Sequence, residues 1–296
     1  MTRRRTASLL ALLVLVAGCA PPRSGSLGPA PTAAPGPPSS TSVGEPPTTA
    51  ASTSTPPNTD TPARPTRDPG TTAASRAATL TLQLWYVRDG RLAPTRRTRP
   101  TTVATSRLAL EELAAGPTTA ESATGLVTLV PDGTQVSRIV AGVATVRLAA
   151  APDPVVGRLR EAQVVYTLTQ FPTVRQVAFG TATPTDRADY ADLLPPIVVT
   201  SPTIGDRVTS PVTVTGSADV FEATVNVRVL DATGRQLATA FTTATCGTGC
   251  RGSYRVNVRY RLSRDQSGTI EVYEVSADDG SRTKTVAVPV TLAATG

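Results

Sequence analysis

The stretch "LAAGPTTAESATGLVTLVPDGTQVSRIVAGVATVRLA" occupies residues 113–149 and organises the first folded region of this 296-residue chain. Gly116-Pro117 ends a preceding helical pattern, because glycine commonly closes a helix and proline cannot continue one. Three short apolar runs follow, broken at residues 131–133 and near Gly142. This arrangement predicts strand, turn, strand, tight turn and strand.

Regular patterns flank this stretch on both sides. Residues 80–87 have strand periodicity and lead into Asp89-Gly90, which predicts a hairpin. Residues 104–115 and 155–170 place apolar side chains at helical spacing, and a closing strand follows Pro172. The predicted order, ββ-α-βββ-α-β, is an α+β fold in which a layer of helices covers a sheet.

The C-terminal region has no helical pattern. Its apolar runs are short and alternating, with turn residues about every ten positions, which is typical of a β-sandwich. The predicted strands are Val212–Gly216, Thr224–Leu230, Gln236–Thr242, Gly252–Tyr260, Gly268–Ser276 and Thr283–Leu292, with a seventh near Ile197. The segment before them, residues 181–196, reads either as a linker or as a packed interface.

The motifs of residues 113–149 resemble the GerMN domain of sporulation and spore-germination proteins. The matching residues are Leu113, Gly116-Pro117, Glu121, Gly125-Leu126, Val130-Pro131-Asp132-Gly133-Thr134, Gly142, Ala144 and Val146. Arg147 departs from the pattern, because the family often has Asp there. The C-terminal region is similar to the immunoglobulin-like (Gmad-type) domain associated with spore germination. The resemblance implies a GerMN-like α+β domain over residues 76–182 and an immunoglobulin-like sandwich over residues 195–293.

Residues 1–18 have the layout of a lipoprotein signal peptide. A positive Arg3–Arg5 segment precedes an apolar run that is too short to span a bilayer. Val16-Ala17-Gly18-Cys19 resembles a lipobox, which implies diacylation of Cys19 and cleavage before it. Because two or more acyl chains hold a protein at a membrane, we expect a lipid anchor on the extracytoplasmic face of the cell membrane. The alternative is an ordinary cleaved signal with an incidental cysteine.

Residues 19–75 are almost wholly Pro, Ser, Thr, Ala and Gly, and contain no aromatic residue. Such a segment cannot bury enough apolar surface to offset its ordering entropy. We therefore expect a disordered stalk between the anchor and the first domain.

Two groups of residues are candidates for binding or cross-linking. Arg96, Arg97 and Arg99 belong to the densest basic segment and read either as a solvated hairpin or as a site for an anionic envelope partner. Cys246 and Cys250 predict a disulfide, because an exported chain meets oxidising conditions, with free thiols or a redox pair as alternatives. The chain has no histidine, so we expect neither a zinc site nor another cofactor. No nucleic-acid motif accompanies the positive charge.

The sequence offers little catalytic machinery. Without histidine a Ser-His-Asp triad is excluded, and the Glu271/Glu274 and Asp278-Asp279 pairs have spacings that point to opposite faces of a strand. Glu222, between apolar neighbours, reads either as a structural carboxylate bonded to backbone or as a functional contact. We expect a non-catalytic lipoprotein that mediates protein–protein contacts in the envelope, which the resemblance links to sporulation and germination. The alternatives are a lipoprotein that binds cell-wall glycan (peptidoglycan) or a small ligand, and a hydrolase that uses carboxylates.

Replacing Cys19 with Ala is expected to abolish incorporation of labelled palmitate and to shift the protein from the membrane to the soluble fraction, because the thiol is the acylation site. Radiolabelling and cell fractionation measure both effects. Exchanging Cys246 and Cys250 for Ala together leaves the label in place. Palmitate retained by the Cys19→Ala protein would contradict the lipobox interpretation.

Overall fold

A computed structural model describes residues 78–295, so the predicted signal peptide, the stalk and Cys19 lie outside the described residues. The first domain consists of β1 (Thr79–Arg88), β2 (Arg91–Pro100), α1 (Thr105–Ala115), α2 (Thr119–Ser122), β3 (Gln135–Val140), β4 (Val143–Arg147), α3 (Pro154–Leu168) and β5 (Gln176–Phe179). Within the described range no helix has both the length and the apolar character needed to cross a membrane.

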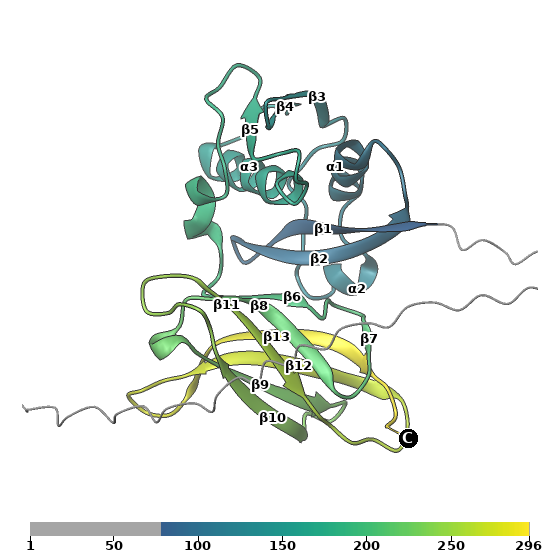
Figure 1. The fold of residues 1–296 in the computed structure, drawn as a ribbon, viewed down its shortest axis with the longest axis vertical. Coiled ribbons are helices and arrows are strands. Elements are labelled where there is room, and N and C mark those ends of the chain that lie inside the picture. The colour runs from purple at the N-terminus through teal and green to yellow at the C-terminus, as the bar shows by residue number, and fades with distance from the viewer. Residues whose placement is uncertain (1–77, 296) are drawn as a thin grey trace, which may run out of the picture. The chain divides into compact units, whose positions relative to one another are not determined.

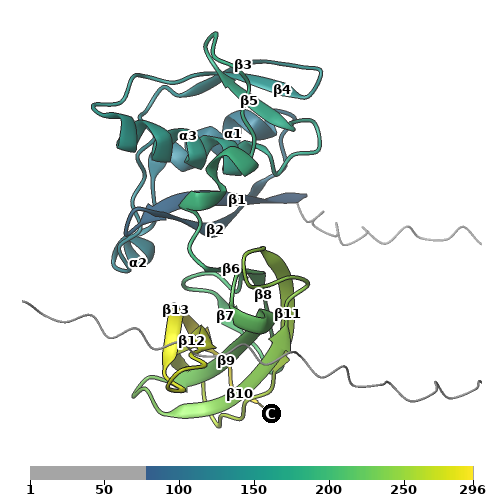
Figure 2. The same ribbon diagram turned by 90° about the vertical axis from the view of Figure 1, so that its left-hand side faces the viewer.

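Helices α1 and α3 lie between two small sheets (Figures 1 and 2). One sheet is the antiparallel β1–β2 hairpin, and the other has the order β3-β4-β5 with β4 and β5 parallel. The predicted α+β class is confirmed, but the prediction of one helical layer on one sheet is wrong. The reason lies in α3, where every residue from Ala162 to Leu168 is buried, so the helix is covered on both sides.

The predicted strand after Gly125 is absent from the described fold. Only one bridge forms there, between Val127 and Val87. The backbone N–H of Leu129 donates instead to the side chain of Gln163 on α3, at 2.8 Å. The segment is therefore held by a helix side chain rather than by a strand, and α2 is an additional short helix that the pattern did not predict.

The hairpin and both long helices begin and end near the predicted positions. Asp89 and Gly90 have φ of 52° and 68°, the positive values that a tight two-residue hairpin turn requires. Helix α1 ends before Gly116, and α3 begins at Pro154, where the Asp153 side chain accepts from the N–H groups of the first turn.

The segment that follows the first domain is packed rather than extended. It contains a short 3-10 helix, η1 (Ala188–Leu193). The buried Tyr190 hydroxyl donates to Glu161 at 2.9 Å, and Asp192 pairs with Arg158 at 2.6 Å. Because Glu161 and Arg158 both lie on α3, these contacts tie η1 to the first domain.

The second domain is a two-sheet sandwich, as the alternating pattern predicted. Its elements are β6 (Ile197–Ser201), β7 (Arg207–Val208), β8 (Val212–Ala218), η2 (Phe221–Ala223), β9 (Thr224–Asp231), β10 (Gln236–Thr243), β11 (Gly252–Val258), β12 (Gln266–Val275) and β13 (Arg282–Leu292). The sheets have the orders β10-β9-β12-β13-β7 and β11-β8-β6. The two-residue β7 and the single turn η2 were too short for the pattern to show. Valines dominate the core, and those of β9 are fully buried.

Gly216 on β8 is expected to tolerate no side chain, because a Cβ there would overlap the Val198 carbonyl oxygen of β6. Gly216→Ala should therefore lower the free energy of unfolding by about 1–3 kcal/mol, measured by urea denaturation. The matched control is Gly157→Ala on α3, where a Cβ finds its nearest neighbour at 3.4 Å. That variant should gain about 0.5–1 kcal/mol from helix propensity. Equal stability of the Gly216→Ala and parent proteins would contradict the packing described for β6 and β8.

Candidate functional site

Arg97 on β2 and Glu121 on α2 form a buried ion pair, with side chains 10% and 2% exposed. Arg97 Nη1 donates to Glu121 Oε1 at 2.8 Å, and its Nη2 donates to Oε2. The Thr95 hydroxyl also donates to Oε1. The Thr118 N–H and hydroxyl donate to Oε2 at 2.8 and 3.0 Å. The Glu121 N–H donates in turn to the Thr118 hydroxyl at 3.4 Å, so Thr118 and Glu121 form a capping box for α2. Each carboxylate oxygen is therefore fully occupied.

The charge state of this cluster follows from its hydrogen bonds. Burial alone raises the pKa of Glu121, but the bonds from Arg97 and Thr95 outweigh it and lower the pKa to about 2. Burial raises the pKa of the neighbouring Tyr86 to about 12. The Tyr86 hydroxyl donates to the carbonyl of Gly116 at 2.8 Å, and the Arg97 guanidinium lies 6.0 Å from its ring centre. Glu121 is thus fixed as an anion that holds α2 and β2 together.

The other two candidate arginines are also paired. Arg99 binds Glu112 of α1 through two bonds of 2.7 Å. Arg96 pairs with Asp206, which precedes β7, at 3.0 Å. Arg96, Arg97 and Arg99 thus each have a carboxylate partner within the chain, and of the three pairs only Arg97–Glu121 is buried.

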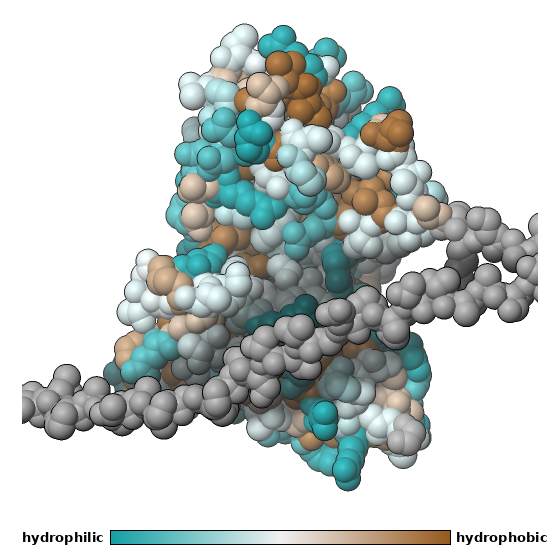
Figure 3. All heavy atoms as spheres, viewed as in Figure 1, coloured by the Kyte–Doolittle hydropathy of each residue, from teal (hydrophilic) through white to brown (hydrophobic). Residues whose placement is uncertain are grey.

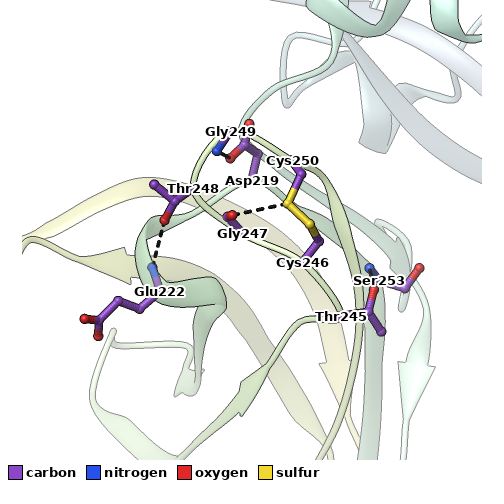
Figure 4. Close-up of a disulfide and its surroundings, with 9 residues drawn as sticks. All are labelled: Asp219, Glu222, Thr245, Cys246, Gly247, Thr248, Gly249, Cys250 and Ser253. Carbon is purple, nitrogen blue, oxygen red and sulfur yellow. Dashed lines mark hydrogen bonds between the residues drawn. A yellow bond between two sulfur atoms is a disulfide. The ribbon is translucent and has the colours of Figure 1, made fainter.

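Cys246 and Cys250 are joined in a disulfide that closes the loop between β10 and β11 (Figure 4). The closed loop rests on the turn before β9. The Thr248 N–H donates to the Val220 carbonyl at 3.0 Å, and the Gly249 N–H donates to Asp219 at 2.9 Å. The loop and this turn together form one corner of the sandwich.

Glu222 lies in this corner, with its side chain exposed and directed away from the disulfide (Figure 4). Its backbone N–H donates to the Thr248 hydroxyl at 3.1 Å. Its φ of 51° is unusual for a residue with a side chain and turns the carboxylate outward. The backbone hydrogen bond expected of this carboxylate is not formed within the described residues.

Glu274 on β12 performs the structural task that the sequence suggested for Glu222. Its carboxylate accepts from the Phe221 N–H at 2.7 Å and from Lys284 Nζ at 2.8 Å. Burial raises the pKa of Glu274, and the Lys284 bond reverses this and lowers it. Glu271 is occupied elsewhere, by Arg228 at 2.5 Å. The two carboxylates therefore do not converge on a common site, and in residues 78–295 no cluster of three or more potential metal ligands forms.

Family models cover both domains. Residues 81–180 match the family described as "Sporulation and spore germination", and residues 196–281 match the "Immunoglobulin-like domain of bacterial spore germination". The chain carries two spore-germination domains. No curated relative matches the sequence.

Solved structures show weaker likenesses. The tandem GerMN domains of the sporulation protein GerM from Bacillus subtilis are 20% identical over 38% of this chain and 42% of that chain, with a TM-score of 0.27. CopC from Methylosinus trichosporium OB3b is 16% identical over 34% of this chain and 96% of that chain, with a TM-score of 0.23. The aligned part thus spans less than half of the GerM chain.

Within the GerMN domain, the family motif and the buried cluster coincide at Glu121. The sequence identified this residue only through the resemblance, because a glutamate in a polar segment carries no sign of burial. Its partner Arg97 was selected for the opposite reason, as an exposed cation. A capping-box pattern, Thr118 followed three positions later by Glu121, was the local signal that was available.

Glu121→Gln is expected to lower the free energy of unfolding of the GerMN domain by about 3 kcal/mol at neutral pH, because it leaves Arg97 buried without its counter-charge. The pKa of Glu121 is lowered from 4.5 to about 2 in the folded state. Its stabilisation is therefore fully present above pH 4.5 and is lost as the pH falls through about 2. Urea denaturation across this range should show a steeper loss of stability with falling pH in the parent than in the variant, which keeps only the contribution of the other carboxylates. Glu111→Gln, which breaks an exposed pair with Arg107, is the control and should change stability by less than about 0.5 kcal/mol.

Proposed function

We propose that this chain is a non-catalytic lipoprotein, anchored through Cys19 on the extracytoplasmic face of the membrane, whose two domains contact other envelope proteins. Three features support the proposal. The lipobox resemblance places an acylation site at Cys19, the Cys246–Cys250 disulfide suits an oxidising compartment, and both domains belong to families linked to spore germination.

The main support for protein binding is that two strands, β3 and β10, each lie at the edge of a sheet. Sheet order places β3 at one end of its sheet and β10 at one end of another. Val140 on β3 is 61% exposed, and Phe241 on β10 is 72% exposed. Figure 3 shows apolar surface over the β3–β4 end of the first domain. An end strand offers unpaired backbone groups and, with exposed apolar side chains, suits the addition of a partner's strand.

The absence of catalysis is part of the same proposal. The two buried glutamates, Glu121 and Glu274, are each occupied by structural donors. Neither family description names a reaction. A wall-glycan site at Arg96, Arg97 and Arg99 is not favoured, because all three guanidinium groups are already paired with carboxylates.

Val140→Asp and Phe241→Asp are each expected to reduce the recovery of one cross-linked partner at least fivefold, since a charge at an apolar contact opposes desolvation. The measurement is cross-linking in intact cells followed by affinity purification and quantitative mass spectrometry. Val103→Asp is the matched control, because Val103 is fully exposed and lies outside any strand.

Partner recovery unchanged in both strand variants would contradict protein binding through these strands. Equal loss in the Val103→Asp protein would show a general effect of added charge. Measured turnover of a substrate, abolished by Glu222→Gln, would contradict the non-catalytic part of the proposal.

A further inference from the structure

The sandwich contains a long segment of one charge sign. From residue 232 to residue 264 the chain carries six arginines and no aspartate or glutamate. They are Arg235, Arg251, Arg255, Arg259, Arg261 and Arg264. Because like charges placed close together repel, such a segment raises the local positive potential unless other parts of the chain neutralise it.

Strand β11 and the residues that follow it display three of these arginines on one side. Burial alternates along this segment, with Tyr254, Val256, Val258 and Tyr260 buried in the core. The residues between them are exposed, and they include Arg255, Arg259 and Arg261. Side chains two residues apart on one face of a strand are about 7 Å apart. We call Arg255, Arg259 and Arg261 the β11 arginine row.

The row ends in a hollow. An open cleft at the end of the sandwich is lined by Arg235, Arg259 and Arg261, together with Ser210 and Gln236. It therefore combines three guanidinium groups with a side-chain amide, and Arg235 is also paired with Asp231. The Ser210 hydroxyl donates to the Tyr260 carbonyl at 2.8 Å. The cleft lies between the beginning of β10 and the residues that follow β11.

The row keeps its charge because the nearby carboxylates are engaged elsewhere. Asp231 binds Arg235 at 3.1 Å, and Asp265 binds Arg207 at 2.7 Å. Within residues 78–295, Arg255, Arg259 and Arg261 form no ion pair with a carboxylate. This is the reverse of Arg96, Arg97 and Arg99, each of which has a carboxylate partner.

We propose that the β11 arginine row and its hollow bind a linear phosphate polymer. A guanidinium fork binds phosphate through paired hydrogen bonds, and a phosphate offers more acceptor oxygens than a carboxylate to a site where several guanidinium groups and an amide meet. Arg255, Arg259 and Arg261 share one face and are spread over about 20 Å of extended chain, which suits a polymer with several charges rather than a single ion. This inference goes beyond the proposed function, because it depends neither on the lipid anchor nor on the end strands.

The test uses the full chain purified in mild detergent and titrated with fluorescently labelled long-chain inorganic polyphosphate at several salt concentrations. Replacing Arg259 and Arg261 together by Gln should weaken binding at least tenfold at constant salt. It should also reduce the slope of log affinity against log salt by about 1.4, the value for two lost phosphate contacts on a flexible chain. The matched control replaces Arg138 and Arg147 together by Gln, which removes the same charge from exposed positions of the GerMN domain.

Three results would overturn the proposal. The first is no binding by the parent protein at low salt, and the second is equal weakening in the two double variants, which would indicate general attraction to net charge. The third is equally tight binding of polyglutamate of matched length, which would remove the preference for phosphate. If the Arg259/Arg261 double variant fails to fold, hydrogen exchange on the parent chain decides. Polyphosphate must then slow exchange at the backbone amides of residues 252–262 relative to the rest of the sandwich.

Discussion

The buried pair of Arg97 and Glu121 is the interaction on which the GerMN domain depends. It joins the second strand of the hairpin to α2, and the same carboxylate caps that helix through Thr118. The Glu121 carbonyl also accepts from the Leu126 N–H at 3.3 Å, so the pair fixes where the chain leaves α2. Two charges inside a protein stay favourable only when their remaining hydrogen-bonding positions are filled. Thr95, Thr118 and Arg97 fill them here, so no part of this cluster can change alone.

The parts of the fold that could be predicted are those in which apolar and polar side chains alternate or recur at a fixed spacing. The long strands of the sandwich have one buried and one exposed face, so their sequences carry the period directly. The segment after Gly125 was predicted wrongly because a short apolar run occurs both in buried strands and in buried irregular segments. What decides between them is Gln163, a residue 34 positions away from Leu129 whose side chain reaches the backbone.

The candidate site also depends on contacts between residues that are far apart in the sequence. Arg96, Arg97 and Arg99 could be recognised as a basic cluster, but their partners lie 110, 24 and 13 positions away along the chain. No local pattern reveals such pairs. The net charge of a region therefore says little about its surface. In the hairpin, Arg96, Arg97 and Arg99 are paired with carboxylates, whereas the β11 arginine row forms no such pair within residues 78–295.

The disulfide shows how a covalent bond can act on shape more than on stability. It closes a loop whose ends are only four positions apart, so the entropy it removes from the unfolded chain is worth about 2 kcal/mol. The closed loop meets the core of the sandwich at Val220, whose carbonyl accepts from the Thr248 N–H at 3.0 Å. Strand pairing uses residues 236–243 and 252–258, so neither sheet includes the closed loop. The cross-link therefore fixes the path of the chain at one corner of the sandwich, where residues 247–249 meet the turn before β9.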